Sequence, residues 1–69
     1  MKRKAVIDKL KKAAKSAGLE YDQYELTNHT GITIGGKAST LGRHSEIDDL
    51  TAHKFFEQFA AVLGKGWWR

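Results

Sequence analysis

Hydrophobic residues near the N-terminus recur with the spacing of a helix. Within residues 4–17 they occupy every third or fourth position, and lysines fill most of the others, which predicts an amphipathic α-helix. Gly18 and Leu19 follow directly, so we expect the glycine to end the helix and the leucine to fold back against its last turn. The apolar face of this helix consists of Val6, Ile7, Leu10, Ala13, Ala14 and Ala17.

The pattern changes to a period of two in the middle of the chain. Apolar and polar residues alternate within 23–27 and again within 31–34, and several are aromatic or β-branched, as is typical of strands. We expect a first turn near 28–31 and a second at Gly35-Gly36, because consecutive glycines adopt positive φ at little cost. A short third strand over 37–41 would complete an antiparallel meander.

A second amphipathic helix is predicted near the C-terminus. It begins within 48–51, where acidic residues and a threonine suit the N-cap or first turn, and it ends at Leu63, before a glycine. Three aromatic residues, Phe55, Phe56 and Phe59, form the centre of its apolar face. We interpret them as the cover of one face of the sheet. His53, at the flank of this apolar face, is interpreted as a surface residue.

The predicted order of elements is therefore α-β-β-β-α in one domain over residues 1–69. In this α+β fold both helices lie on one face of a three-stranded antiparallel sheet, which leaves the other face open, as in double-stranded RNA-binding domains. The tail 64–69 carries Trp67 and Trp68, for which two interpretations stay open. The two rings either fold back to extend a small core, or they form a recognition surface for bases or a partner protein.

The composition narrows the possible functions. The chain has no cysteine, which excludes disulfides and thiolate metal sites, and three widely spaced histidines do not make a zinc site. No apolar run approaches the roughly 20 residues of a membrane span. The basic N-terminus lacks the apolar segment of a secretory signal, so we expect a cytoplasmic protein.

The positive charge belongs to one element. Residues 1–15 contain seven basic residues against Asp8 alone, a net charge of +6, whereas the rest of the chain carries −2 of the total +4. The first helix is therefore a candidate for contacts with RNA phosphates, although its lysines are equally typical of a solvated helix face. The candidate contacts are Lys4, Lys11, Lys12 and Lys15.

His29 is the leading candidate for chemistry. It lies at the expected start of the second strand, with the parity opposite to that of Ile32 and Ile34. Since the isoleucines must face the helices, His29 is expected on the open face of the sheet, where it can meet a ligand.

The order of these motifs resembles that of the HicA toxins, which are small mRNA interferases with a fold like that of double-stranded RNA-binding domains. The resemblance covers about residues 4–63. It is most specific in Thr40-Leu41-Gly42-Arg43-His44-Ser45-Glu46-Ile47, which is similar to the family's Ile/Val-Pro-Arg-His-x-Glu-Ile segment.

This resemblance implies that His29 matches the family's catalytic histidine. It also implies that the substrate is RNA, that no metal or other cofactor is needed, and that an antitoxin of the HicB type covers the active face. Two positions differ from the family pattern. Thr27-Asn28 stands where the family usually has a pair of small residues, and Gly42 replaces the proline before Arg43.

Cleavage of RNA without a metal uses the 2′-OH of the RNA as nucleophile, and it needs a base, an acid and cations. Imidazole suits both proton transfers because its ordinary pKa is about 6.5. One histidine cannot do both at once, so His44 or a lysine of the first helix is the candidate partner of His29, although a structural role suits His44 as well. Lys37 and Arg43 are expected to stabilise phosphate charge. Asn28 or Thr27 is expected to orient the imidazole or to donate to the phosphate.

Two hypotheses follow from the sequence. The first is a HicA-like toxin that binds RNA, cleaves mRNA and inhibits growth. The second is a small non-enzymatic effector, suited to a phage or mobile element. It would bind nucleic acid or a host protein through the first helix and the tryptophan tail.

Overall fold

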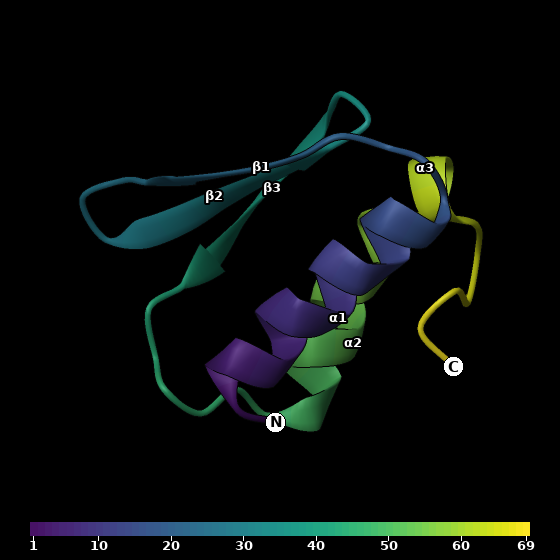
Figure 1. The fold of residues 1–69 in the computed structure, drawn as a ribbon. Coiled ribbons are helices and arrows are strands. Elements are labelled where there is room, and N and C mark those ends of the chain that lie inside the picture. Colours follow the sequence, from purple (N-terminus) through teal and green to yellow (C-terminus); the bar gives the residue numbers. More distant parts are fainter.

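The helices and strands follow the predicted order in the computed structural model, which describes residues 1–69. The three strands form one antiparallel sheet in the order β1-β2-β3. Both long helices lie on the same side of this sheet, and the chain ends beside them (Figure 1). The α+β fold is thereby confirmed. Its elements are α1 (Arg3–Ser16), β1 (Tyr21–Glu25), β2 (His29–Ile34), β3 (Lys37–Gly42), α2 (Asp49–Glu57) and α3 (Ala60–Leu63).

A single hydrophobic core fills the space between the sheet and the helices. Strand alternation points Ile32, Ile34 and Leu41 toward the helices, and all three are buried. The predicted aromatic cover is confirmed, because the three phenylalanines of the C-terminal segment are buried as well. The core contains Val6, Ile7, Leu10, Ala14, Ile32, Ile34, Leu41, Ile47, Ala52, Phe55, Phe56 and Phe59.

The ends of the two long helices are fixed by local hydrogen bonds of the expected kinds. Gly18 follows α1 with φ of +70°, and the amide of Leu19 reaches back to the carbonyl of Ala14 at 2.9 Å. At the start of α2, the carboxylate of Asp48 accepts hydrogen bonds from the amide and the hydroxyl of Thr51, at 3.1 and 2.6 Å.

The last helix is not continuous, contrary to the prediction. It stops at Glu57 and resumes as the short α3, with Gln58 and Phe59 between them. At this point the amides of Phe59 and Val62 donate to carbonyls three residues back, at 3.0 and 3.1 Å. This is the tighter hydrogen-bond pattern of a 3₁₀ turn. The tighter turn occurs where the Phe59 side chain is fully buried. None of the helices has the length and apolarity needed to cross a membrane.

The first hairpin lies two or three residues nearer the N-terminus than predicted. The β1 strand covers Tyr21–Glu25, and the amide of Leu26 bonds to the carbonyl of His29 at 2.7 Å, so Thr27-Asn28 forms the tip. Gly31, expected in the turn, therefore lies inside β2, opposite Tyr24. The second turn is confirmed, because Gly35 and Gly36 have φ of +55° and +87°.

Candidate functional site

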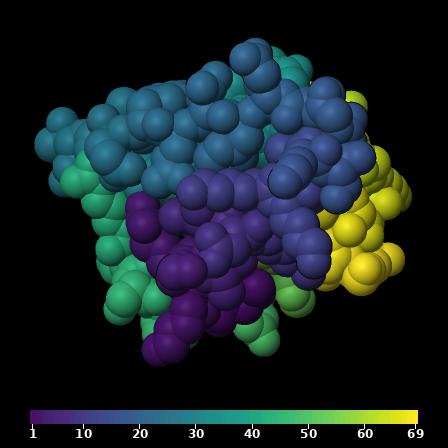
Figure 2. All heavy atoms as spheres, viewed as in Figure 1, coloured from purple at the N-terminus to yellow at the C-terminus, as the bar shows by residue number.

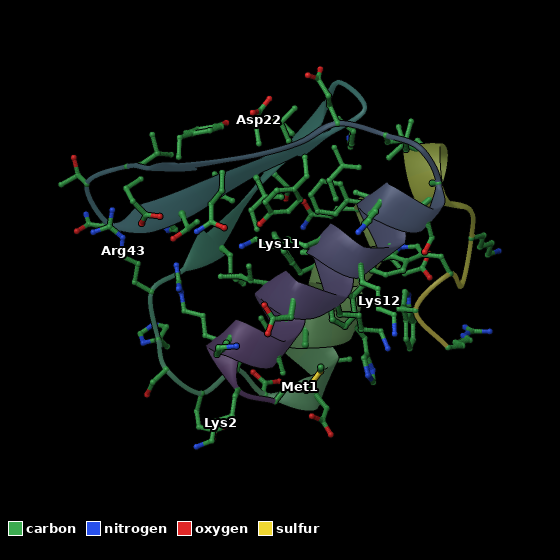
Figure 3. All side chains as sticks on the ribbon, in the orientation of Figure 1. Met1, Lys2, Lys11, Lys12, Asp22 and Arg43 are labelled. Carbon is green, nitrogen blue, oxygen red and sulfur yellow. The ribbon has the colours of Figure 1, made fainter.

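His29 lies on the face of the sheet that the helices leave open, as predicted. Its neighbour Thr30 is fully buried on the covered side, and His29 is exposed with the opposite parity. Figure 3 shows Asp22, on the same open face, pointing away from the helices. By pairing and alternation, the open face consists of Asp22, Tyr24, His29, Gly31, Thr33, Ala38, Thr40 and Gly42.

His44 covers Gly42, the cross-strand partner of His29, on this open face. The cross-strand partner of His29 is Gly42, and a Cβ on Gly42 would be 3.3 Å from Cδ2 and 3.8 Å from Nε2 of His44. The ring of His44 therefore occupies the place that a larger side chain at Gly42 would take. Side chains of directly opposed residues begin about 5 Å apart, so His44 covers the position next to the start of the His29 side chain. We call His29, His44 and the intervening Gly42 the two-histidine site.

Arg43 stabilises this end of the sheet from the covered face. Its guanidinium donates to the carbonyl oxygens of Leu26 and His29, the second at 3.4 Å, and its Nε lies 3.0 Å from the carboxylate of Glu25. Figure 3 places Arg43 at the tip end of the β1–β2 hairpin. The side chain that was predicted to stabilise phosphate therefore holds the backbone of His29 and shares its charge with a carboxylate.

A polar network on the covered face continues from Arg43 to α1. The Thr30 hydroxyl donates to the carboxylate of Glu25 at 2.9 Å and accepts a hydrogen bond from Arg3. These two hydrogen bonds satisfy the hydroxyl of the one buried polar side chain in the protein. We call Arg3, Glu25, Thr30 and Arg43 the covered-face network.

The covered-face network was not predicted from the sequence, although the sequence contains a signal for it. Thr30 shares the parity of Ile32 and Ile34, so its hydroxyl had to be buried and to have a partner. The network also acts on charge. The hydroxyl of Thr30, with smaller contributions from Gln23 and the two arginines, holds the pKa of Glu25 below its ordinary value. An open hollow beside the network is lined by Arg3, Glu25, Arg43 and Ser45.

Two further candidates lie at opposite ends of the sheet. Asn28 is exposed at the hairpin tip, next to His29. Lys37 pairs with Ile34 at the far end of β2, and Ile34 is five positions along the strand from His29. This separation is about 16 Å at the usual rise of a strand, so the structure does not bring Lys37 to the two-histidine site.

The lysines of α1 lie on the other side of the sheet from His29. Lys4, Lys11, Lys12 and Lys15 are all exposed, and Lys11 and Lys12 are labelled on the helix in Figure 3. Lys4 is paired with Asp8 at 2.9 Å, and Lys11 lies 5.8 Å from the centre of the Tyr21 ring. Because α1 packs against the covered face, these lysines form a separate basic surface.

The tryptophan tail folds back onto α2, which is the first of the two interpretations left open by the sequence. The indole NH of Trp67 donates to the carbonyl of Phe56 at 2.8 Å, and Trp68 stacks on His53 with ring centres 4.4 Å apart. The carboxylate of Glu57 accepts from the amide of Gly66 at 2.9 Å and from the indole NH of Trp68. The ring of Trp68 therefore partly covers His53, which lies at the surface with intermediate exposure. The tail covers one end of the molecule (Figure 2).

Comparison of the chain with family models, curated proteins and solved structures gives no match.

Proposed function

We propose that the chain is a HicA-like toxin that binds RNA and cleaves mRNA at the two-histidine site, thereby inhibiting growth. The observation that carries this proposal is the position of His44 over Gly42, the cross-strand partner of His29, on the face that no helix covers. Two histidines at the same end of one face suit a reaction that needs a base and an acid at the same time. The resemblance of residues 40–47 to the HicA family supports the same assignment.

In the proposed reaction, one imidazole accepts the proton of a ribose 2′-OH while the 2′-oxygen attacks the adjacent phosphorus. The bond from phosphorus to the 5′-oxygen breaks, and the other histidine, which starts protonated, donates its proton to that oxygen. The products are a 2′,3′-cyclic phosphate and a 5′-hydroxyl. Exchange of protons with water restores both histidines, and the reaction as written uses no metal or other cofactor.

Arg43 and Asn28 have supporting roles in this proposal. Arg43 is a positioning residue, because it holds the carbonyl of His29 and the hairpin that precedes it. Asn28 is exposed next to His29 in the sequence, and in this proposal its amide donates to a phosphate oxygen. Lys37 has no role at the reacting phosphate, because it lies at the far end of the sheet.

The test is substitution of each histidine, with Thr33→Ala as a control on the same face of the same strand. We expect His29→Ala and His44→Ala each to lower the rate of RNA cleavage by about 10²- to 10⁴-fold, the usual contribution of a general acid or base. Growth inhibition on expression should disappear with cleavage. If either variant keeps its fold and its full cleavage rate, that histidine is not part of the reaction.

The ends of the RNA fragments test the reaction itself. Attack by the 2′-OH predicts cyclic phosphate ends and no cleavage of an oligonucleotide whose scissile nucleotide is 2′-deoxy. Cleavage of the deoxy substrate at an unchanged rate would show that another nucleophile is used.

A second candidate is a nucleic-acid-binding effector that does not cleave. The basic surface of α1 favours it, because these exposed lysines lie away from the two-histidine site and suit phosphate contacts alone. In that case growth inhibition persists in His29→Ala, whereas replacement of Lys12 and Lys15 by Gln reduces both the binding of nucleic acid and its dependence on salt. Binding to a host protein through the tail is less favoured, because both indoles pack against α2.

A toxin of the proposed kind acts on mRNA in the cytoplasm and requires a partner that blocks it. We propose an antitoxin of the HicB type that covers the open face. Co-expression with the product of a neighbouring reading frame should restore growth. Protection of the amides of β2 and β3 from hydrogen exchange in the complex would place the partner on the sheet.

A further inference from the structure

The open face carries one aromatic side chain near the two-histidine site. Tyr24 pairs with Gly31 across the sheet, and a Cβ on Gly31 would overlap the tyrosine ring, with Cδ2 only 2.8 Å away. The ring therefore lies across the bare backbone of Gly31, which is buried, while 43% of Tyr24 is exposed. One side of the ring packs on the sheet and the other faces solvent.

The surroundings of the ring leave it accessible. The partner of Gly31 on the other strand is Thr40, and the next pair along the open face is Thr33 with Ala38. These side chains are short, so the tyrosine is the largest group in this part of the face. A flat aromatic surface on an open sheet is how several RNA-binding folds hold unpaired bases.

The distance from the ring to the two-histidine site matches an extended nucleotide chain. Gly31 lies two residues from His29 on β2, which is about 7 Å at the usual rise of a strand. A nucleotide whose phosphate lies between the two histidines can thus place a neighbouring base over the ring.

Charge on the open face favours the same orientation. Its one carboxylate, Asp22, pairs with Thr33 and so lies at the end remote from His29. Asp22 repels phosphates from that end, which leaves the end with the two histidines as the favoured position for a phosphate.

We propose that Tyr24 is a stacking platform for a base of single-stranded RNA, next to the phosphate held by the two-histidine site. This inference rests on the proposed function, because it assigns the base beside the reacting phosphate. It commits the site to unpaired RNA, since a duplex hides the faces of its bases. The aromatic ring makes this contact sequence-tolerant, because every base has a face that can stack.

The test measures binding to a probe that the protein cannot cleave by the proposed reaction. The probe is a fluorescent single-stranded hexamer of deoxyuridine, which lacks the 2′-OH, and the matched control is a hexamer of abasic residues with the same charge. We expect Tyr24→Leu to bind the deoxyuridine hexamer about tenfold more weakly than wild type, and Tyr24→Phe to bind nearly as well as wild type. The abasic hexamer should bind equally to all three proteins. Equal binding of the deoxyuridine hexamer by wild type and Tyr24→Leu overturns the inference, and so does an equal loss with the abasic hexamer.

A measurement on the unchanged protein covers the case in which Tyr24→Leu does not fold. On titration with the deoxyuridine hexamer, the ring protons of Tyr24 and the amide of Gly31 should show the largest NMR shifts. Shifts confined to α1 overturn the inference.

Failure of the inference and failure of the proposed function remain distinguishable. Cleavage of RNA without any effect of Tyr24 on binding refutes the platform and leaves the reaction intact. Tyr24-dependent binding that persists in His29→Ala, in a protein that cuts no RNA, supports the platform and refutes the reaction.

Discussion

The two faces of the sheet are built from alternate residues of the same strands, yet they have different contents. The covered face contributes Ile32, Ile34 and Leu41 to the core, and its one buried polar side chain is fully hydrogen-bonded. The open face has small side chains, one exposed aromatic ring and a pair of histidines. The stability of the domain therefore resides on one face, which leaves the other available for reactive groups.

The two faces meet at the start of β2, where His29 and Thr30 are adjacent in sequence but point in opposite directions. The covered-face network binds Thr30 directly, and Arg43 also holds the carbonyl of His29. Groups on the stable face therefore hold the backbone that carries the open-face imidazole.

The largest contrast is expected between neighbouring residues of β2. Ile32→Ala removes a fully buried side chain and should cost about 2–5 kcal/mol of unfolding free energy. A domain of this size rarely has more than about 3–5 kcal/mol, so we expect the variant to be largely unfolded. Thr33→Ala, on the open face, should change stability by less than about 0.5 kcal/mol. Urea unfolding followed by circular dichroism measures both, and equal losses would contradict the division between the faces.

A smaller effect is expected when only a hydroxyl is removed. Thr30→Val keeps the shape of the side chain but leaves Arg3 and Glu25 without their shared partner, which should cost about 1–3 kcal/mol. The same substitution at Thr40, which is exposed on the open face, is the matched control and should be nearly neutral. Equal midpoints of urea unfolding for the two variants would show that the covered-face network does not stabilise the fold.

The smallest effect on stability is expected when the pH is lowered. The pKa of Glu25 is lowered in the folded protein, chiefly by the Thr30 hydroxyl, so its ionised form stabilises the fold above the pKa of the unfolded chain, which is about 4.3. This stabilisation is lost as pH falls below that value and through the folded pKa. Urea midpoints should therefore fall between pH 5 and pH 3 less steeply in Glu25→Gln than in wild type.

Two other carboxylates require a control for this acid effect. The pKa of Glu46 is lowered by a hydrogen bond from Lys2, and that of Asp48 by hydrogen bonds from Thr51, so wild type loses stability in acid for several reasons. Glu20→Gln, at an exposed carboxylate, should follow the wild-type pH profile. A Glu25→Gln profile that coincides with that of Glu20→Gln would exclude a contribution from the Glu25 carboxylate.

Periodicity was sufficient to predict the order of the elements and the face of His29, because both depend on local alternation of side chains. Periodicity failed to predict the structure where packing of the core determines the course of the backbone. The last helix is interrupted at the buried Phe59. The first hairpin turns earlier in the chain than predicted, and Gly31 lies beneath Tyr24. Periodicity also could not pair Arg43 with Glu25, because their contact joins β1 to the segment after β3 and depends on side-chain geometry that no spacing in the sequence encodes.

Because the tail folds back onto α2, the tryptophan fluorescence of this protein reports on one part of the fold. Trp67 and Trp68 are its only tryptophans, and both pack on α2, on the side of the sheet away from the open face. Their fluorescence is a local probe of this corner, whereas the far-ultraviolet circular dichroism signal comes from all the helices and strands. If both signals change at one urea concentration, the tail and the sheet unfold as a single cooperative unit. If the emission changes first, the tail detaches from an intact fold.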